Sequence, residues 1–272
     1  MTDAAVRPFV VVPCLNEEHA IGNLLEAVLA HCRDVIVIDD GSSDRTAEVV
    51  SHMPVTLIRH AERRGKGEAL RAGFREALKR GASGVLTLDG DGQHDPADIP
   101  RILAAAHRFP GTLIVGARML GRERQPGARR RANDFADWGI SWGCGRPVAD
   151  TQSGQRWYPR AAAELTDLHA QDFVFEAAIL IAASRDLDMP VVSVPVVCRY
   201  DHGARHSHFS PVRDVVRITW YTLRRVLHYG HLVQSYRASH GSPPNVHDPD
   251  ARLGASTSTP RRHVGSPPAR ES

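Results

Sequence analysis

Short apolar runs alternate with helix-length amphipathic segments along the first half of the chain. Four of these runs predict strands, and the second lacks strict polar alternation, which is typical of a strand buried on both faces of a sheet. They are Phe9–Val12, Val35–Ile38, Val55–Ile58 and Val85–Leu88. Between them apolar residues recur at helical spacing, as in the stripe from Ile21 to Leu29. Strands that alternate with helices of about a dozen residues predict an α/β fold with a doubly wound, mostly parallel sheet.

The second half of the chain continues this pattern less regularly. A helix is expected over Ile99–Arg108, a strand over Leu113–Ala117 and a buried helix over Phe173–Ala183. The last strand, Val191–Val197, contains Pro195, and because proline has no N–H to donate we expect this strand near an edge. A chain of 272 residues can bury one substantial core, so we expect a single folded domain up to about residue 210.

Polar and charged residues follow the ends of the predicted strands. Doubly wound sheets bind ligands beyond the carboxyl ends of their strands, so the fold would gather these residues on one rim. The residues are Pro13, Asn16, Glu17, Asp39, Asp40, Lys66, Asp89 and Asp91. The sequence therefore predicts a ligand site along that rim.

Two carboxylates, Asp89 and Asp91, come directly after the fourth predicted strand. Gly90 separates them and has no Cβ that would block a sharp turn or a close ligand. Carboxylates at this spacing can reach one hard divalent cation, and Gln93 and His94 offer further ligands in the same turn. The stretch therefore favours a metal site.

Two rival interpretations of this stretch fail on its residues. An EF-hand loop that starts at Asp89 would need glycine where His94 stands and glutamate where Pro100 stands. A dinucleotide fingerprint would need a third glycine at Asp95, and acid beside a pyrophosphate repels it unless a metal intervenes. An ordinary Asp-Gly turn stays open until the rest of the chain is considered.

A basic segment, Arg118–Arg131, contains only one acidic residue, Glu123. Its glycine and proline content predicts a mobile loop. The loop either lies solvated in water or forms an electropositive cover over phosphates or anionic headgroups. Its position beside the rim favours the second interpretation.

Two acids, Asp172 and Glu176, lie at the start of the predicted helix near Phe173. Either carboxylate could act as a general base. Acid at a helix N-terminus also simply complements the helix dipole, so both interpretations stay open.

Residues 211–238 have an amphipathic pattern with Arg213, Arg217 and Arg224 on one face, beside Trp220. A basic amphipathic helix with an aromatic edge can lie on an anionic membrane surface. Alternatively, its apolar face packs on the domain and its arginines stay in water. The sequence does not decide between these alternatives.

Composition narrows the remaining choices. The net charge of +3 is too weak to indicate a nucleic-acid partner, and no nucleic-acid-binding motif is present. The cysteines, Cys14, Cys32, Cys144 and Cys198, are scattered, which argues against a zinc site or a disulfide framework and favours a cytoplasmic protein. Residues 239–272 are rich in Gly, Ser, Pro, Thr and Arg and predict a disordered tail.

Five motifs, taken together, carry a resemblance to a known family. They are Val11-Val12-Pro13-Cys14-Leu15-Asn16-Glu17-Glu18, Asp39-Asp40-Gly41-Ser42-Ser43-Asp44, Gly65-Lys66-Gly67, Asp89-Gly90-Asp91-Gly92-Gln93-His94 and Asp150-Thr151-Gln152-Ser153-Gly154. In order and spacing, over roughly residues 8–215, the chain resembles family 2 glycosyltransferases of the GT-A fold. Within that family it looks most like the dolichyl-phosphate mannose synthase and polyprenyl-phosphate glycosyltransferase branch.

The resemblance implies one catalytic domain with a Rossmann-like nucleotide-binding half and an acceptor half, a nucleotide-diphosphate sugar donor (GDP- or UDP-) and Mg²⁺ or Mn²⁺. By this resemblance the base and ribose are held by Pro13, Asn16, Glu17, Asp39 and Asp40. Lys66 would lie near the nucleotide, Gly90 beside the donor, and Asp89, Asp91 and Gln93 around the metal. Asp91 would thereby assist departure of the nucleoside diphosphate.

The resemblance also assigns residues further along the chain. Arg118 would meet a phosphate of the donor or acceptor. The late segment with Arg205, Ser207 and His208 would contact the donor, although the family usually has lysine or arginine where His208 stands. The charge of this histidine depends on pH, so a constant positive charge is missing there.

The functional prediction depends on whether the acceptor is a phosphate or a hydroxyl group. We expect an inverting transfer of sugar to a polyprenyl or dolichyl phosphate at the membrane surface, by a cytoplasmic protein in peripheral contact with the membrane. A phosphate acceptor is already an anion and needs no strong base, whereas a hydroxyl acceptor would need one, with Asp172 and Glu176 as candidates. A nucleotide-sugar-binding protein without turnover is the second alternative.

Overall fold

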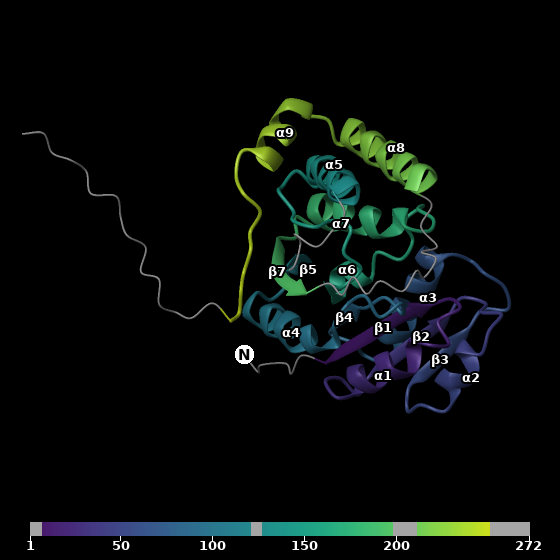
Figure 1. Cartoon of the computed structure of the whole chain (residues 1–272). Coiled ribbons are helices and arrows are strands. Elements are labelled where there is room, and N and C mark those ends of the chain that lie inside the picture. Colours follow the sequence, from purple (N-terminus) through teal and green to yellow (C-terminus); the bar gives the residue numbers. More distant parts are fainter. Residues whose placement is uncertain (1–6, 121–126, 198–210, 251–272) are drawn as a thin grey trace, which may run out of the picture.

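The computed structural model describes residues 7–120, 127–197 and 211–250 (Figure 1). Its centre is a seven-stranded sheet in the order β3-β2-β1-β4-β6-β5-β7. The strands are β1 (Pro8–Cys14), β2 (Val35–Asp39), β3 (Thr56–Arg59), β4 (Gly84–Thr87), β5 (Leu113–Leu120), β6 (Arg156–Pro159) and β7 (Val191–Val197). Every pair is parallel except those that β6 makes with β4 and β5. The prediction of an α/β, mostly parallel sheet is confirmed.

Helices cover both faces of the sheet. They are α1 (Ile21–Leu29), α2 (Thr46–Ser51), α3 (Lys66–Lys79), a 3-10 turn (Pro96–Asp98), α4 (Ile99–Arg108), α5 (Gly127–Cys144), α6 (Arg160–Ala163), α7 (Val174–Asp186), α8 (Pro211–Tyr229) and α9 (Leu232–His240). Figure 1 shows α1 and α2 at one end of the molecule and α5, α8 and α9 at the opposite end.

Two apolar cores form on the two faces of the sheet. Val11 of β1 packs into the core that contains Phe74 of α3 and Phe175 of α7. Its neighbours Val10 and Val12 point the other way, into the core of α1 and α4. Burial on both faces explains why the sequences of β1, β2 and β4 lack polar alternation, whereas β3, at the edge of the sheet, is partly exposed.

The antiparallel strand β6 was not predicted from the sequence. It has four residues, and its first, Arg156, is charged and lies opposite Thr87 of β4. A strand this short has no periodicity to recognise. Its consequence is local, because β6 brings the segment Asp150–Gly154 against the end of β4.

The prediction of a mobile loop over Arg118–Arg131 is wrong for most of the described residues. Strand β5 continues to Leu120, and α5 begins at Gly127. The helix packs against α7 and α8 through side chains such as Ile140 and Cys144, both buried. The first turns of α5 are rich in arginine and its apolar contacts come only in later turns, so the sequence there does not show the apolar periodicity of a helix.

The C-terminal region departs from its prediction at two points. The amphipathic segment 211–238 forms two helices, α8 and α9, separated at Gly230 and His231, which both have positive φ. Residues 241–250, assigned to the disordered tail, instead run beside β7, where the N–H of Ser193 donates to the carbonyl of Asn245 at 2.8 Å. The rest of the predicted tail lies outside the described residues. No helix among residues 7–120, 127–197 and 211–250 is long and apolar enough to cross a membrane.

The prediction that β7 lies near an edge is confirmed, since β7 is the last strand of the sheet. Its outer side is covered by the segment that follows α9. His247 donates its N–H to the carbonyl of Ser193, and Arg101 of α4 contacts Asp248 at 2.9 Å and Asp250 at 3.2 Å. Such cover protects an edge strand that would otherwise be open to pairing.

Candidate active site

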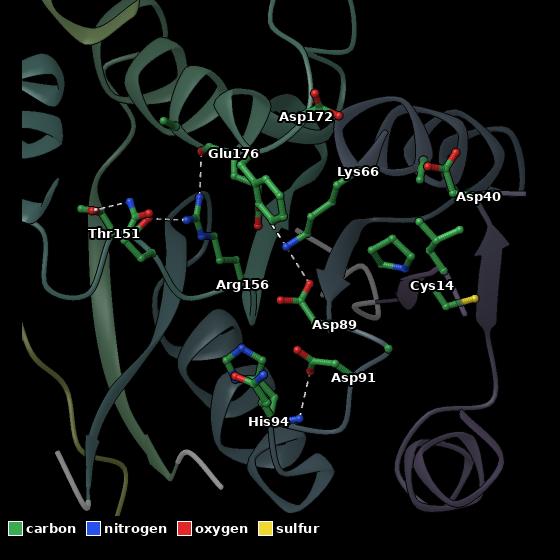
Figure 2. Close-up of a pocket in the computed structure, with 18 of the residues that line it drawn as sticks. Cys14, Asp40, Lys66, Asp89, Asp91, His94, Thr151, Arg156, Asp172 and Glu176 are labelled. Carbon is green, nitrogen blue, oxygen red and sulfur yellow. Dashed lines mark hydrogen bonds and ion pairs between the residues drawn. The ribbon is translucent and has the colours of Figure 1, made fainter. Parts of the chain in front are cut away.

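A cavity of about 650 Å³ opens beyond the carboxyl ends of β1 and β4. It is lined by residues from both halves of the chain. The polar and charged ones are Glu17, Asp40, Arg63, Lys66, Asp89, Asp91, Gln93, His94, Arg118, Asn133, Thr151, Gln152, Arg156, Asp172 and Glu176. Figure 2 shows Lys66 pointing to Asp89 near the centre, with Cys14 and Asp40 to one side and Thr151 and Arg156 to the other. Most of the residues that we expected along the rim of the sheet therefore line one cavity.

Lys66 is the central charge of this cavity. Its Nζ lies 2.7 Å from Oδ1 of Asp89 and 2.9 Å from Oε2 of Glu176. Burial alone would lower the pKa of Lys66, but the attraction of the two carboxylates outweighs it and raises the pKa. Burial alone would raise the pKa of Asp89, but the attraction of Lys66 outweighs burial and lowers it. The lysine is held charged between two anions, with the ring of Phe173 beside it at 5.4 Å.

The glycines around Lys66 let α3 start against α7. A Cβ on Gly65 would lie 2.0 Å from Oδ1 of Asp172, and one on Gly67 would lie 3.0 Å from both the Asp172 carbonyl oxygen and the Cβ of Phe175. Gly65 also has a φ of +93°, which favours glycine. The Gly65-Lys66-Gly67 motif thus aims the lysine into the cavity while the two helices touch.

Asp40 organises the approach to Lys66 as well as lining the cavity. Its carboxylate accepts hydrogen bonds from the backbone N–H groups of Arg64 and Gly65 at 2.9 and 2.8 Å, and it contacts Nδ1 of His60 at 2.7 Å. This carboxylate therefore fixes the loop that leads into α3. The resemblance implied that Asp40 holds the base or ribose. To do so, its carboxylate oxygens would have to bind the donor as well as this loop.

The other residues assigned to the base and ribose divide into two groups. Pro13 and Glu17 line the cavity. Asp39 is fully buried, accepts from the N–H of Ser42 and contacts Arg59, so it is not part of the lining. Asn16 has a φ of +57° and accepts from the N–H of Ser43, also away from the cavity. The structure thus brings two of these four to the cavity wall and leaves two as supports of the loops behind it.

Gly90 allows the loop after β4 to lie directly on β1. Its N–H donates to the carbonyl of Pro13 at 3.2 Å, and a Cβ there would lie 2.8 Å from the Cβ of Cys14. The close approach expected at Gly90 is therefore an approach to Pro13 and Cys14 of β1. It fixes Asp89 and Asp91 on either side of this contact.

Asp91, Gln93 and His94 line the cavity, and Figure 2 shows Asp91 and His94 on the same side of Asp89. The N–H of Gln93 donates to Oδ1 of Asp91 at 3.0 Å. His94 is buried, and its Nδ1 has no hydrogen-bond partner in the described part of the chain. Burial lowers the pKa of His94 to about 4 against the opposing pull of Asp89, so its imidazole is neutral at pH 7.

Among the described residues no group of three or more His, Cys, Asp and Glu side chains is arranged to hold a metal ion. Asp89, Asp91 and Gln93, the predicted metal ligands, nevertheless line one cavity. One Asp89 oxygen is bonded to Lys66, so a cation would have to share that carboxylate with the lysine or displace it.

Arg118 reaches the cavity from the end of β5, and its guanidinium forms a bidentate ion pair with Asp150. Its Nε and NH2 groups lie 2.7 and 2.6 Å from the two oxygens of Asp150, whose Oδ2 also accepts the Arg118 backbone N–H. Burial opposes ionisation of Asp150, but hydrogen bonds from Arg118 lower its pKa overall. The guanidinium is thus held rigidly at the cavity wall, as a bidentate pair allows.

The two acids proposed as bases have different surroundings. Glu176 is buried, and its carboxylate is bonded to Lys66. Asp172 has a φ of +49°, lines the cavity near its mouth and lies 3.4 Å from Arg217 of α8. Arg205, Ser207 and His208, predicted to contact the donor, lie outside the described residues.

The family model for glycosyl transferase family 2 matches residues 9–165, more than half of the chain. This chain is a family 2 glycosyltransferase. The match spans the motifs from β1 to β6, including the acids after β4 and the Asp150–Gly154 turn. The resemblance on which the fold was predicted is therefore confirmed.

Curated relatives of this glycosyltransferase include enzymes named for polyprenyl-phosphate acceptors. A UDP-N-acetylglucosamine–dolichyl-phosphate N-acetylglucosaminyltransferase of Methanococcus voltae is 25% identical over 70% of this chain and 85% of its own length. An undecaprenyl-phosphate mannosyltransferase of Micrococcus luteus is 28% identical over 70% and 83%. An uncharacterized protein of Methanocaldococcus jannaschii is 30% identical over 71% and 81%.

Solved structures support the fold. Glucosyl-3-phosphoglycerate synthase of Mycobacterium tuberculosis, in complex with phosphoglyceric acid, superposes with a TM-score of 0.63 at 22% identity. The likeness covers 82% of this chain and 81% of that one. At this identity it establishes a shared GT-A architecture.

Three residues of this glycosyltransferase were not recognised as site residues from the sequence. Arg156 is fully buried and donates to the carbonyls of Thr151 and Glu176. Asp150 orients Arg118, and Asp137 of α5 accepts both the N–H and the hydroxyl of Thr151 at 2.7 Å. The Asp150–Gly154 motif was a usable signal for Asp150, whereas Asp137 lies on a helix that the sequence did not predict.

Proposed function

We propose that this glycosyltransferase moves a sugar from a nucleotide-diphosphate sugar to a polyprenyl phosphate, with inversion at the sugar and with Mg²⁺ or Mn²⁺ bound. The observation that carries the proposal is one cavity in which Asp89, Asp91, Lys66 and Arg118 converge. Two carboxylates for a cation and two fixed positive groups are what a pyrophosphate and a second phosphate require.

The residues present fit a hard divalent cation. Asp89, Asp91 and Gln93 offer oxygen atoms on the same wall, and the buried His94 adds a neutral nitrogen without a hydrogen-bond partner among the described residues. When bound, such a cation stabilises charge on the departing diphosphate as a Lewis acid. A glucosyl-3-phosphoglycerate synthase of the same fold was crystallised with Mn²⁺ and UDP, which agrees with the proposal.

The chain's own cations have separate tasks in this proposal. Lys66 balances Asp89 and Glu176 before the donor binds and is close enough to turn toward a donor phosphate. Arg118, held by Asp150, meets a phosphate without having to be ordered first. Preorganised charge of this kind favours the transition state over the unbound state.

The surroundings of the two candidate bases favour a phosphate acceptor. The carboxylate of Glu176 lies 2.9 Å from Lys66 and that of Asp172 lies 3.4 Å from Arg217, so each is already paired with a cation of the chain. A lipid monophosphate is already ionised and needs neither of them. The names of the Methanococcus and Micrococcus relatives agree with this acceptor. With a lipid acceptor, the enzyme would work in peripheral contact with the cytoplasmic face of a membrane.

The proposal is tested by nucleotide release from a panel of GDP- and UDP-sugars with Mn²⁺, with and without polyprenyl phosphate. We expect one donor to release nucleotide only when the lipid phosphate is present. Release that depends instead on a saccharide or small hydroxyl acceptor would contradict the lipid assignment. Donor binding without release for any acceptor would indicate a binding protein.

Substitution of Asp172 distinguishes a phosphate acceptor from a hydroxyl acceptor. With a phosphate acceptor, Asp172→Asn should lower turnover by less than about ten-fold, because no proton has to be removed. A fall of about 10² to 10⁴ with donor binding intact would identify Asp172 as a general base and favour a hydroxyl acceptor.

A further inference from the structure

The outer side of α8 presents an apolar stripe to solvent. Val216, Trp220, Leu223 and Leu227 have exposed fractions of 62%, 61%, 40% and 58%. Their spacing of four, three and four residues puts all of them on one side of the helix. A large exposed patch of this kind marks a surface that contacts something else.

The stripe is not the face by which α8 packs on the domain. Ile218, Thr222 and Val226 face inward and are buried, with exposed fractions of 6%, 5% and 1%. They lie nearly opposite Trp220 around the helix. The helix therefore has two apolar faces, and the packing alternative considered for this segment accounts for only one of them.

The apolar surface continues along α9, which follows α8 after Gly230. Leu232, Val233 and Tyr236 have exposed fractions of 39%, 65% and 41%. Figure 1 shows α8 and α9 at the end of the molecule farthest from α1 and α2. Exposed aromatic and aliphatic groups thus lie on both helices at that end.

The charge on this pair of helices has one sign at the surface. Between Pro211 and His240 the sequence contains one acidic residue, Asp214, which is buried. Arg217, Arg224 and Arg237 are exposed beside the apolar groups. Exposed arginines next to aromatic and aliphatic side chains complement an anionic lipid surface. A second copy of the same face would instead bring like charges together.

Helix α8 also forms part of the cavity wall, together with α5. Val215 of α8 lines it, immediately before the exposed Val216. Ala132 and Ala136 of α5 line it as well. The part of the cavity wall that α5 and α8 contribute is therefore mostly apolar and adjoins the exposed face of α8.

We propose that α8 and α9 dock the enzyme on an anionic bilayer through the stripe Val216–Leu227 and its flanking arginines. The cavity wall formed by α5 and α8 would then face the lipid, so that a prenyl chain can stay in the bilayer while its phosphate enters the cavity. This orientation rests on the proposed function, whereas the docking itself does not.

Vesicle sedimentation tests the docking. The full chain should bind vesicles of phosphatidylcholine mixed with phosphatidylglycerol more tightly than vesicles of phosphatidylcholine alone. Trp220→Glu and Leu223→Glu should each weaken binding by about ten-fold or more, because each removes a large apolar contact from the bilayer. Val246→Glu, at an apolar side chain of similar exposure beside β7, should leave binding unchanged. Unaltered circular dichroism in the variants excludes misfolding as the cause.

The docking proposal is overturned if the wild type does not bind the mixed vesicles, or if the two variants bind as the wild type does. It is also overturned if the stripe proves to hold a dimer that Trp220→Glu dissociates without affecting vesicle binding. Turnover on a short-chain, water-soluble prenyl phosphate is measured separately, and Trp220→Glu should retain the wild-type rate. Vesicle binding without any turnover would refute the proposed function and leave the docking standing.

Discussion

The cavity wall formed by β1, β4 and α3 holds its side chains in place by charge, whereas the wall formed by α5 and α8 presents mostly small apolar groups beside Asn133. On the first wall Asp89 and Lys66 are bonded to each other, and Asp40 holds the loop before α3. On the second, the lining includes Ala136 and Val215. A preorganised charged wall suits a ligand with fixed phosphates, and a wall of small apolar groups suits a flexible hydrocarbon chain.

The largest expected effect comes from removing the central charge of the first wall. Lys66→Met would leave Asp89 and Glu176 facing each other without a cation, and we expect a loss of about 3 to 5 kcal/mol in the free energy of unfolding at pH 7. The loss should be smaller at pH 5 than at pH 7, because protonation of one of two facing carboxylates relieves their repulsion. Urea denaturation at both pH values measures it. Lys66→Arg is the charge-conserving control, and equal losses in both variants would contradict the account.

A second prediction concerns Asp137, which ties α5 to the Thr151 turn. Burial outweighs its hydrogen bonds with Thr151 and raises its pKa from 3.8 to about 6. A raised folded-state pKa stabilises the fold below pH 4, and this contribution is lost as pH rises toward 6 and above. We expect the difference in unfolding free energy between wild type and Asp137→Asn to change by about 2 kcal/mol between pH 4 and pH 7. A difference that does not vary with pH would contradict this.

The apolar wall can be altered without touching the charged one. Ala136→Phe narrows the acceptor side, and we expect the KM for polyprenyl phosphate to rise by about ten-fold while donor affinity stays the same. Titration of the nucleotide checks the second part. A parallel loss of donor affinity would show that the two walls are not separate subsites.

The smallest effect is expected from the C-terminal segment, which belongs to neither wall. Deletion after Ser239 removes the cover of β7 and should lower the free energy of unfolding by about 1 kcal/mol. Deletion after Asp250 should leave it unchanged. Thermal melting of both truncations compares them, and turnover in solution should be unaffected by either. Equal stability of the two truncations would mean that the contacts at Ser193 contribute nothing.

Much of the fold was predictable because β1, β2 and β4 are buried on both faces and their apolar runs are uninterrupted. Strand β6 was not predictable, since it is short and opens with a buried arginine whose bonds go to Thr151 and Glu176. Helix α5 was hidden by the arginines that precede its apolar turns.

The sequence predicted which residues belong to the site better than it predicted the contacts between them. The rim residues Lys66, Asp89 and Asp91 follow from strand ends, because a parallel sheet gathers such positions. Lys66 and Glu176 lie 110 positions apart in the sequence, and no local pattern predicts that they pair. Asp39 and Asn16 have the right residue types but point to loops behind the cavity, which only the backbone geometry reveals.

The central claim is that Asp89 and Asp91 hold a divalent cation at the donor diphosphate, and calorimetric titration of UDP and GDP with and without Mn²⁺ tests it most directly. Mn²⁺ should tighten nucleotide binding to the wild type and to the control Asp167→Ala, whose side chain is 96% exposed. In Asp91→Ala the enhancement by Mn²⁺ should be lost. Unchanged Mn²⁺-dependent binding in Asp91→Ala would contradict the claim.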